Sequence, residues 1–218
     1  MNKKIQSAVM VFTIVATTLL GYSATASQAG TYKDQITALN SLVTQPESRT
    51  GYVRSKFKHW LNAGNGCDVR KAVILSEAIK KPTVDKSCKI TGGEWYSPYD
   101  DVKVTDASKL DVDHMVPLAE AWDSGASAWD ALKREKYAND QTDPIHLISV
   151  TAASNRSKSD QDPAEWVPTN KSYVCTYVTN WIAIKVRWQL NVDQKEKDTL
   201  IQILKTCKPQ KIIVKALP

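Results

Sequence analysis

The stretch Leu110-Asp-Val-Asp-His-Met-Val-Pro-Leu118 determines the predicted fold and the predicted site of this chain. Its residues alternate between two faces, with Leu110, Val112 and His114 on one of them, so we expect a strand that ends at Pro117. An acidic residue directly before a histidine at the end of a strand can place a carboxylate and an imidazole beside one phosphate. The stretch therefore predicts a catalytic site.

Two segments further along the chain complete this predicted site. His146-Leu-Ile-Ser-Val150 contains a short apolar strand over residues 147–150. Ser154-Asn-Arg-Ser-Lys158 lies in a helix that we expect over residues 153–159. That helix is expected to return toward the end of the first strand.

These residue types suit the hydrolysis of a phosphodiester, which needs a base for water and a cation to offset the charge on the phosphate. His114 is the candidate base, because a neutral imidazole accepts a proton near neutral pH. Asp113 offers the hard oxygen ligand that Mg²⁺ prefers, and Asn155 offers a neutral oxygen. Arg156 can contact phosphate through two parallel hydrogen bonds, and Lys158 can contact it as a point charge.

Three runs of sequence carry a resemblance to a known family: Asp111-Val-Asp-His-Met-Val-Pro-Leu-Ala-Glu-Ala-Trp-Asp-Ser-Gly-Ala126, Tyr137-Ala-Asn-Asp140 and Asn155-Arg-Ser-Lys-Ser-Asp-Gln-Asp-Pro-Ala-Glu-Trp166. They resemble a secreted bacterial branch of the HNH endonuclease superfamily, also called ββα-metal nucleases. That branch is similar to the C-terminal nuclease domain of GmrSD-type restriction enzymes. The strong resemblance covers about residues 110–166.

The resemblance implies an α+β fold, with an HNH ββα-metal core embedded in a mostly helical single domain. It implies that Asp113 is a metal ligand, that His114 is the general base, and that Asn155 is the second protein ligand. The central asparagine of the family, which holds the base imidazole, is matched by residue type at Asn139 and by strand position at His146. We place Asn139 first. The resemblance also implies one divalent ion, with Mg²⁺ expected and Mn²⁺ as the alternative, and products with 5′-phosphate ends.

The N-terminal residues 1–26 predict a secretory signal peptide. Lys3 and Lys4 precede an apolar run over Ala8–Leu20, and Ala24-Thr-Ala26 is a small-residue cleavage site. The apolar run is too short for a comfortable membrane span, and no later run is long enough to be one. We therefore expect a secreted protein whose single nuclease domain covers residues 27–218, without a membrane span and as a monomer.

Four cysteines fit an exported protein: Cys67, Cys88, Cys175 and Cys207. An even count in such a chain favours disulfides, and four cysteines allow three pairings. We favour Cys67–Cys88 and Cys175–Cys207, because each pair closes a local loop. A zinc site is the rival interpretation, but no close ligand spacing supports it.

Apolar spacing predicts the other elements. Helices are expected over residues 32–43, 69–79, 128–139 and 173–190, together with a last helix that Asp193 caps. The aromatic stripe of the helix over 173–190 is expected to face the core. Short strands are expected over residues 94–96 and 102–105, and residues 212–214 are expected to be a tail.

The charge of the chain is compatible with nucleic acid as a partner. The formal net charge is +6, and it falls to +4 when Lys3 and Lys4 are removed with the signal peptide. We expect DNA as the substrate more than RNA, cleaved with low sequence specificity because no separate recognition module is evident. Arg70 lies in the first turn of a helix, where it opposes the helix dipole, so an ion pair or a phosphate contact is predicted for it.

The segment Tyr52–Trp60 interleaves basic and aromatic residues, a pattern that can bind nucleic acid through phosphate contacts and base stacking. The favoured interpretation is plainer: a short amphipathic segment whose aromatic rings face the core. The segment also supports an alternative function, a non-catalytic exported protein that binds polyanions or cell-wall polymer. A zinc hydrolase that uses His114 and His146 is a third hypothesis, for which no His-x-x-x-His pair is present.

Overall fold

The computed structural model describes residues 29–218, so the predicted signal peptide lies outside the described residues. Within that range the α-helices are α1 (Gln35–Asn40), α2 (Val69–Ser76), α3 (Leu118–Asp123), α4 (Ala131–Ala138), α5 (Ala152–Lys158), α6 (Val174–Trp188) and α7 (Gln194–Leu204). Three short 3₁₀ helices are also present: η1 (Arg54–Lys56), η2 (Ala107–Lys109) and η3 (Ala126–Ala128).

The strands of this part of the chain form only two-stranded antiparallel sheets. Their bounds are β1 (Gly30–Tyr32), β2 (Asn62–Gly64), β3 (Cys67–Asp68), β4 (Thr83–Val84), β5 (Ile90–Thr91), β6 (Trp95–Ser97), β7 (Val102–Val104), β8 (Leu110–His114), β9 (Leu147–Thr151) and β10 (Ile212–Val214). The pairs are β1–β10, β2–β3, β4–β5, β6–β7 and β8–β9. The fold is therefore mixed α and β, and the expected description "mostly helical" is too loose.

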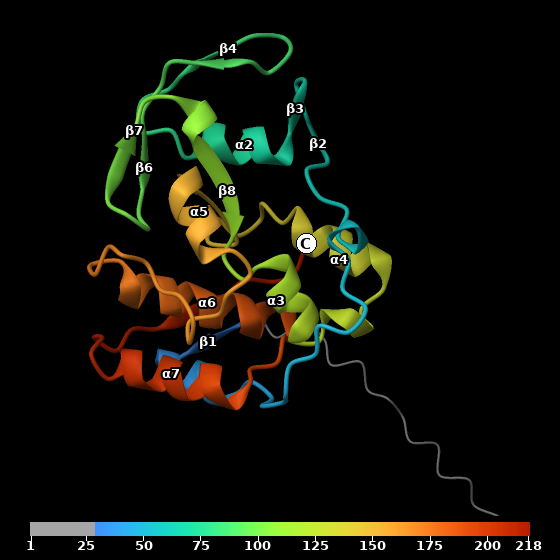
Figure 1. Ribbon diagram of the computed structural model, residues 1–218, viewed down its shortest axis with the longest axis vertical. Coiled ribbons are helices and arrows are strands. Elements are labelled where there is room, and N and C mark those ends of the chain that lie inside the picture. The colour runs from blue at the N-terminus through green and yellow to red at the C-terminus, as the bar shows by residue number, and fades with distance from the viewer. Residues whose placement is uncertain (1–28) are drawn as a thin grey trace, which may run out of the picture.

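β8 lies near the centre of the molecule with α5 beside it (Figure 1), and it pairs with β9. In its register, Asp113 pairs with Ile148 and His114 with Leu147. The chain passes directly from β9 into α5, where the hydroxyl of Thr151 accepts a hydrogen bond from the backbone N–H of Ser154 at 3.2 Å. This sharp return brings α5 back against β8, as the sequence predicts.

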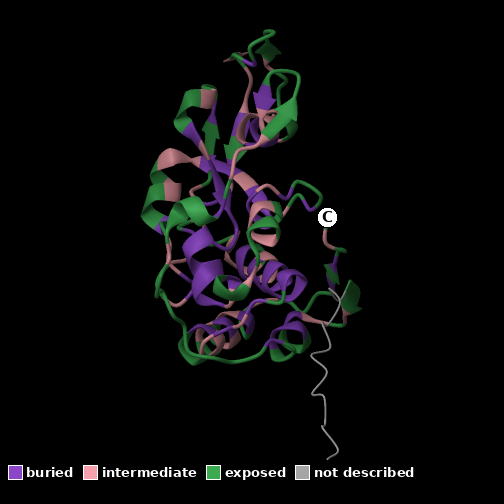
Figure 2. Ribbon diagram, turned by 90° about the vertical axis from the view of Figure 1, so that its right-hand side faces the viewer, coloured by how far each residue is buried: buried purple, intermediate pink, exposed green. Residues whose placement is uncertain are grey.

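Two hydrophobic cores lie on either side of this central pair. A smaller core joins α2 to β6, β7 and the first half of β8; its buried members are Val69, Val73, Ile74, Trp95, Val104, Leu110, Val112 and Leu147. A larger core is built around α6, whose Tyr177, Trp181 and Trp188 are buried as the aromatic stripe predicts. Figure 2 shows the buried residues gathered mainly in the helices of the lower half of the molecule. Asp113 and His114 lie where the two cores meet, since Val112 belongs to one and Met115 to the other.

Both predicted disulfides are present. Cys67–Cys88 ties β3 to the loop before β5, and Cys175–Cys207 ties the start of α6 to the end of α7. Within residues 29–218, no helix is both long and apolar enough to cross a bilayer.

Some boundaries differ from the sequence prediction, for local reasons. The helix expected over residues 128–139 begins at Ala131, because the Asp130 carboxylate caps it by accepting a hydrogen bond from Lys133 N at 2.7 Å. The expected tail over residues 212–214 is instead the strand β10, which pairs with β1. Its partner lies at the other end of the described chain, so no local pattern signals the pairing.

Candidate active site

A cavity of about 300 Å³ opens at the end of β8. Its walls come from β8, from the first residues of α3, from the second half of α5 and from η1. The polar residues in those walls are Arg54, Asp113, His114, Asn155, Arg156, Ser159 and Asp160. The structure thus brings together four of the residues that the sequence singled out as a site: Asp113, His114, Asn155 and Arg156.

His114 is buried, with 4% of its surface exposed, and its orientation is fixed by the backbone. Nε2 lies 2.9 Å from the carbonyl oxygen of Ala138. A carbonyl can only accept, so we assign the ring proton to Nε2, which leaves the lone pair on Nδ1. Burial lowers the pKa of His114 well below its ordinary value, and neighbouring His146 lowers it further. The imidazole is therefore neutral at pH 7, the form that a general base requires.

Asp113 is held by two buried side chains. The hydroxyl of Tyr99 donates to Oδ2 at 2.7 Å, and the Lys158 ammonium lies 2.9 Å from Oδ1 and 2.7 Å from Oδ2. Burial raises the pKa of the Asp113 carboxyl, whereas Lys158 and Tyr99 act to lower it. The carboxylate is thus fixed in one orientation at the wall of the cavity.

Lys158 does not occupy the position that the sequence predicts. We expected a phosphate contact, but its side chain is fully buried and its ammonium also donates to the carbonyl of His114 at 3.0 Å. The reason is electrostatic, because a carboxylate as buried as Asp113 needs a cationic partner. Lys158 therefore stabilises Asp113 and is not available to the substrate.

Asp111 is the point where three predicted site residues meet. Its Oδ2 accepts a hydrogen bond from Asn155 Nδ2 at 3.3 Å and lies 3.9 Å from Arg156 Nε. Its Oδ1 lies 3.8 Å from Arg70, whose guanidinium also donates to the carbonyl of Leu110 at 2.6 Å. Arg70 does not line the cavity, so of its two predicted roles the structure shows the ion pair. Arg156 lines the cavity and is largely exposed.

The two residues proposed to orient the base, Asn139 and His146, lie beside Ala138, whose carbonyl binds the His114 ring. Among the described residues, the His114 ring has no side-chain hydrogen bond to either of them. Asn139 Oδ1 accepts from Leu61 N at 3.0 Å, and its Nδ2 donates to the carbonyls of Lys58 and Glu135 at 2.8 and 2.7 Å. The expected direct contact is therefore wrong, and the carbonyl of Ala138, next to Asn139, takes its place.

His146 is a core histidine behind the site. Its Nε2 donates to the carbonyl of Tyr137 at 2.7 Å, and its ring stands edge-on to that of His114, with 6.2 Å between the ring centroids. Burial lowers the pKa of His146 to about 4, against the opposing effect of Asp140. His146 thus supports the turn over residues 137–139, whose Ala138 carbonyl orients the His114 imidazole.

The residues around the cavity suit a hard divalent cation. Asp113 and Asn155 both line it and both offer oxygen ligands, which Mg²⁺ and Mn²⁺ accept. Asn155 uses its amide nitrogen toward Asp111, which leaves its carbonyl oxygen for an ion. The second histidine that a zinc site would need, His146, is fully buried and does not line the cavity.

A second acidic cluster lies elsewhere in residues 29–218, and an internal cation already compensates it. The Lys185 ammonium is 2.7 Å from Glu120 and 2.6 Å from Glu196. Burial works against the charged ammonium, yet Glu120 and Glu196 raise the pKa of Lys185 above its ordinary value. The two groups of neighbouring carboxylates are Glu47–Asp162–Glu196 and Glu47–Glu120–Asp123, and neither includes Asp113.

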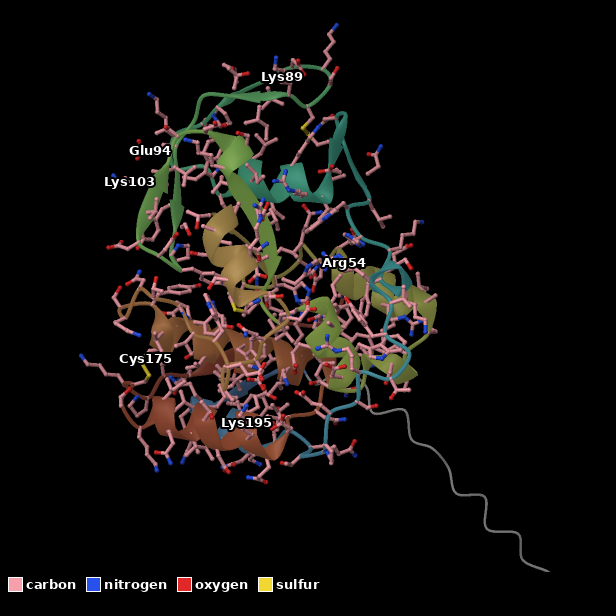
Figure 3. All side chains as sticks on the ribbon, in the orientation of Figure 1. Arg54, Lys89, Glu94, Lys103, Cys175 and Lys195 are labelled. Carbon is pink, nitrogen blue, oxygen red and sulfur yellow. A yellow bond between two sulfur atoms is a disulfide. The ribbon has the colours of Figure 1, made fainter. Side chains whose placement is uncertain are left out.

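Three residues at the site were not assigned a role there from the sequence: Tyr99, Arg54 and Trp60. Tyr99 binds Asp113 across 14 positions of the chain, and no sequence pattern signals that contact. Arg54 lines the cavity, and Figure 3 places its side chain near the end of β8. The Trp60 ring stacks on His114, with 5.3 Å between the ring centroids. Both belong to the basic and aromatic segment over residues 52–60, so that pattern is the sequence signal that indicates them.

Comparison with known proteins places this chain in a family. The family model described as the C-terminal domain of GmrSD restriction endonucleases matches residues 68–203. The chain belongs to this family. The match contains β8, β9 and α5, and therefore Asp113, His114 and Asn155, whereas Arg54 and Trp60 lie before it.

A relative extends beyond the family match. An uncharacterized secreted protein of Arthroderma benhamiae is 42% identical over 170 residues, which cover 78% of this chain and 82% of that protein. No solved structure matches the chain. Since this relative comes from a fungus, it does not support the expected restriction to a bacterial branch.

Proposed function

We propose that this member of the GmrSD C-terminal family is an exported, metal-dependent endonuclease that hydrolyses phosphodiester bonds with His114 as the general base. One observation carries the proposal: a neutral, backbone-oriented imidazole lines the same cavity as Asp113 and Asn155. The antiparallel pair β8–β9 followed by α5 has the order of elements that an HNH core requires, and we assign that core to residues 110–166.

In this proposal Asp113 and Asn155 hold the divalent ion, which is Mg²⁺, with Mn²⁺ as a substitute. A bound divalent ion supplies positive charge that stabilises the phosphate and the leaving oxygen as negative charge develops on them. Tyr99 and Lys158 prepare for this by keeping the Asp113 carboxylate ionised and in one orientation.

Proton transfer and phosphate binding are assigned to side chains of the cavity. His114 takes a proton from water at Nδ1, while its Nε2–H stays bonded to the carbonyl of Ala138. That carbonyl stabilises the imidazolium as it forms and prevents the ring from rotating. Arg54 and Arg156 line the cavity and hold the scissile phosphate by charge-assisted hydrogen bonds.

The proposed substrate is nucleic acid, with DNA preferred to RNA and little sequence specificity. Export is supported by the predicted signal peptide over residues 1–26, by the two disulfides and by the secreted relative. We propose that the secreted form is a monomer that begins near Ser27.

The test is cleavage of supercoiled plasmid DNA and of RNA by the oxidised protein over residues 27–218, in Mg²⁺, Mn²⁺, Zn²⁺ or EDTA. We expect cleavage with Mg²⁺ or Mn²⁺, none in EDTA, and a loss of metal affinity in Asp113→Asn. Cleavage that continues unchanged in EDTA contradicts the role of the ion. A folded protein that cleaves neither polymer with any of the metals contradicts the proposal as a whole.

A further inference from the structure

The His114 imidazole is surrounded by aromatic rings. Trp60 lies against it with 5.3 Å between the ring centroids and 28° between the planes, and Tyr137 is nearly parallel to it at 6.4 Å and 9°. The His146 ring stands edge-on to His114, with 90° between the two ring planes. Tyr137 and His146 are fully buried, whereas Trp60 is only partly buried and comes from a loop. Trp60 is thus the ring whose position depends least on the core.

The backbone of Trp60 indicates that its position is imposed by its surroundings. Its φ is +57°, in the left-handed region that bulky residues rarely adopt. An unsupported loop would relax out of this conformation. A strained residue that stacks on the candidate base points to a role at that base, provided that a separate contact explains how the strain is maintained.

That contact comes from Asn139. Its side chain binds the carbonyl of Lys58 at 2.8 Å and the N–H of Leu61 at 3.0 Å, so it holds the loop on both sides of Trp60. The preceding residue, Ala138, accepts the hydrogen bond from His114. One short turn over residues 138–139 therefore fixes the base through its backbone and fixes the ring that stacks on the base through its side chain.

We propose that Trp60 is a positioning residue for the general base, which stacks on the His114 imidazole and holds it in the orientation needed for proton transfer. This inference rests on the proposed nuclease function. Two physical effects support it. The indole shields the bond between Nε2 and Ala138 from water, and its face attracts the positive charge that His114 gains when it takes the proton. Both effects act on the transition state more than on substrate binding.

Three substitutions test the proposal. Trp60→Phe keeps a ring, Trp60→Leu keeps apolar volume without a ring, and Trp60→Gly removes the ring at a backbone angle that glycine adopts freely, so it relieves strain. We expect kcat to fall about tenfold in the leucine and glycine variants with KM unchanged, and to be largely kept with phenylalanine. Tyr96→Leu, an exposed aromatic on β6, is the matched control and is expected to leave kcat unchanged.

A second readout does not depend on activity. Nitrogen-15 NMR of the metal-free protein at one fixed pH reports which ring nitrogen of His114 carries the proton. We expect Nε2–H in the wild type and in Trp60→Phe, and a mixture of both tautomers in Trp60→Leu and Trp60→Gly. If the wild type cleaves no nucleic acid, the nuclease proposal fails, and this spectrum alone still decides whether Trp60 positions His114.

Three results overturn the inference. The first is an unchanged kcat and an unchanged tautomer in Trp60→Gly. The second is a rise in KM with kcat preserved, which indicates a substrate contact instead. The third is a Trp60→Phe variant as impaired as Trp60→Gly, because an aromatic ring at position 60 then does not support His114.

Discussion

Burial shifts the pKa values of Asp113 and His114, the neighbouring residues at the end of β8, in opposite directions. It lowers the pKa of His114 and raises that of Asp113, because in each case it disfavours the charged form. Lys158 and Tyr99 counteract burial at Asp113, whereas no described carboxylate contacts the His114 ring. The imidazole thus stays neutral, and Asp113 depends on its partners for its charge.

The first prediction at the residue scale concerns pH. A base works in its neutral form, so a lowered pKa extends activity toward acid. We expect kcat/KM, measured at saturating Mg²⁺, to change little between pH 8 and pH 6.5 and to decline only below the ordinary histidine pKa of about 6.5. A half-maximal point at or above pH 6.5 contradicts the assignment of a buried, neutral His114 as the base.

The second prediction concerns phosphate contacts. Arg156 lines the cavity and is largely exposed, so Arg156→Ala is expected to weaken DNA binding and to reduce the slope of log K against log salt by about 1. Lys89→Ala removes the same charge far from the cavity, at the end of the molecule opposite to α7 (Figure 3), and serves as the control. Binding measured at several salt concentrations compares the two. Equal effects of both substitutions would mean that only net charge matters.

At the element scale, one buried ion pair connects α5 to β8 at the site. Lys158 is the last residue of α5 and reaches Asp113 on β8 with no exposed surface. Lys158→Met keeps the volume of the side chain but leaves Asp113 buried without its cation. We expect a loss of about 3–5 kcal/mol in the free energy of unfolding, measured in urea. The double variant with Asp113→Asn should recover much of it, and a single-variant loss below about 1 kcal/mol would contradict the importance of the pair.

Sequence patterns predicted some of the helices and strands but not others. Those with strong local signals were predicted, such as β8, the aromatic stripe of α6, and the helices that Asp68 and Asp193 cap. Those set by distant partners were not. The three-residue strand β10 forms only because β1 pairs with it.

Within the site, too, residues of a sequence motif were predicted, whereas contacts from distant partners were not. A motif brought Asp113, His114 and Asn155 together because β8 pairs with β9, and β9 leads directly into α5. The contacts that tune them come from a backbone carbonyl at Ala138 and from Tyr99, and neither leaves a residue pattern to find. Lys158 was given the wrong partner because the sequence does not reveal how deeply Asp113 is buried.

At the scale of the whole molecule, the site lies between two cores, and one disulfide lies in the chain near each of them. Cys67–Cys88 secures the part of the chain around α2, and Cys175–Cys207 joins α6 to α7 in the larger core.

The disulfides give the prediction at this scale. The Cys175–Cys207 bond closes a loop with a sequence separation of 32, so its loss in the double variant Cys175→Ser/Cys207→Ser should lower the free energy of unfolding by about 3–4 kcal/mol on the chain-entropy account. Denaturant unfolding of the oxidised wild type, the variant and the reduced wild type measures this. A variant as stable as the oxidised wild type contradicts the prediction.

The most direct measurement of the central claim is plasmid cleavage by the wild type and by His114→Gln in Mg²⁺. The two proteins are compared only after circular dichroism shows that both are folded. Glutamine can still donate to the Ala138 carbonyl, but it cannot accept a proton from water. The account predicts that the rate falls by about 10²–10⁴-fold. A His114→Gln protein that cleaves within a few-fold of the wild-type rate would contradict it, because the base would then have to be another group.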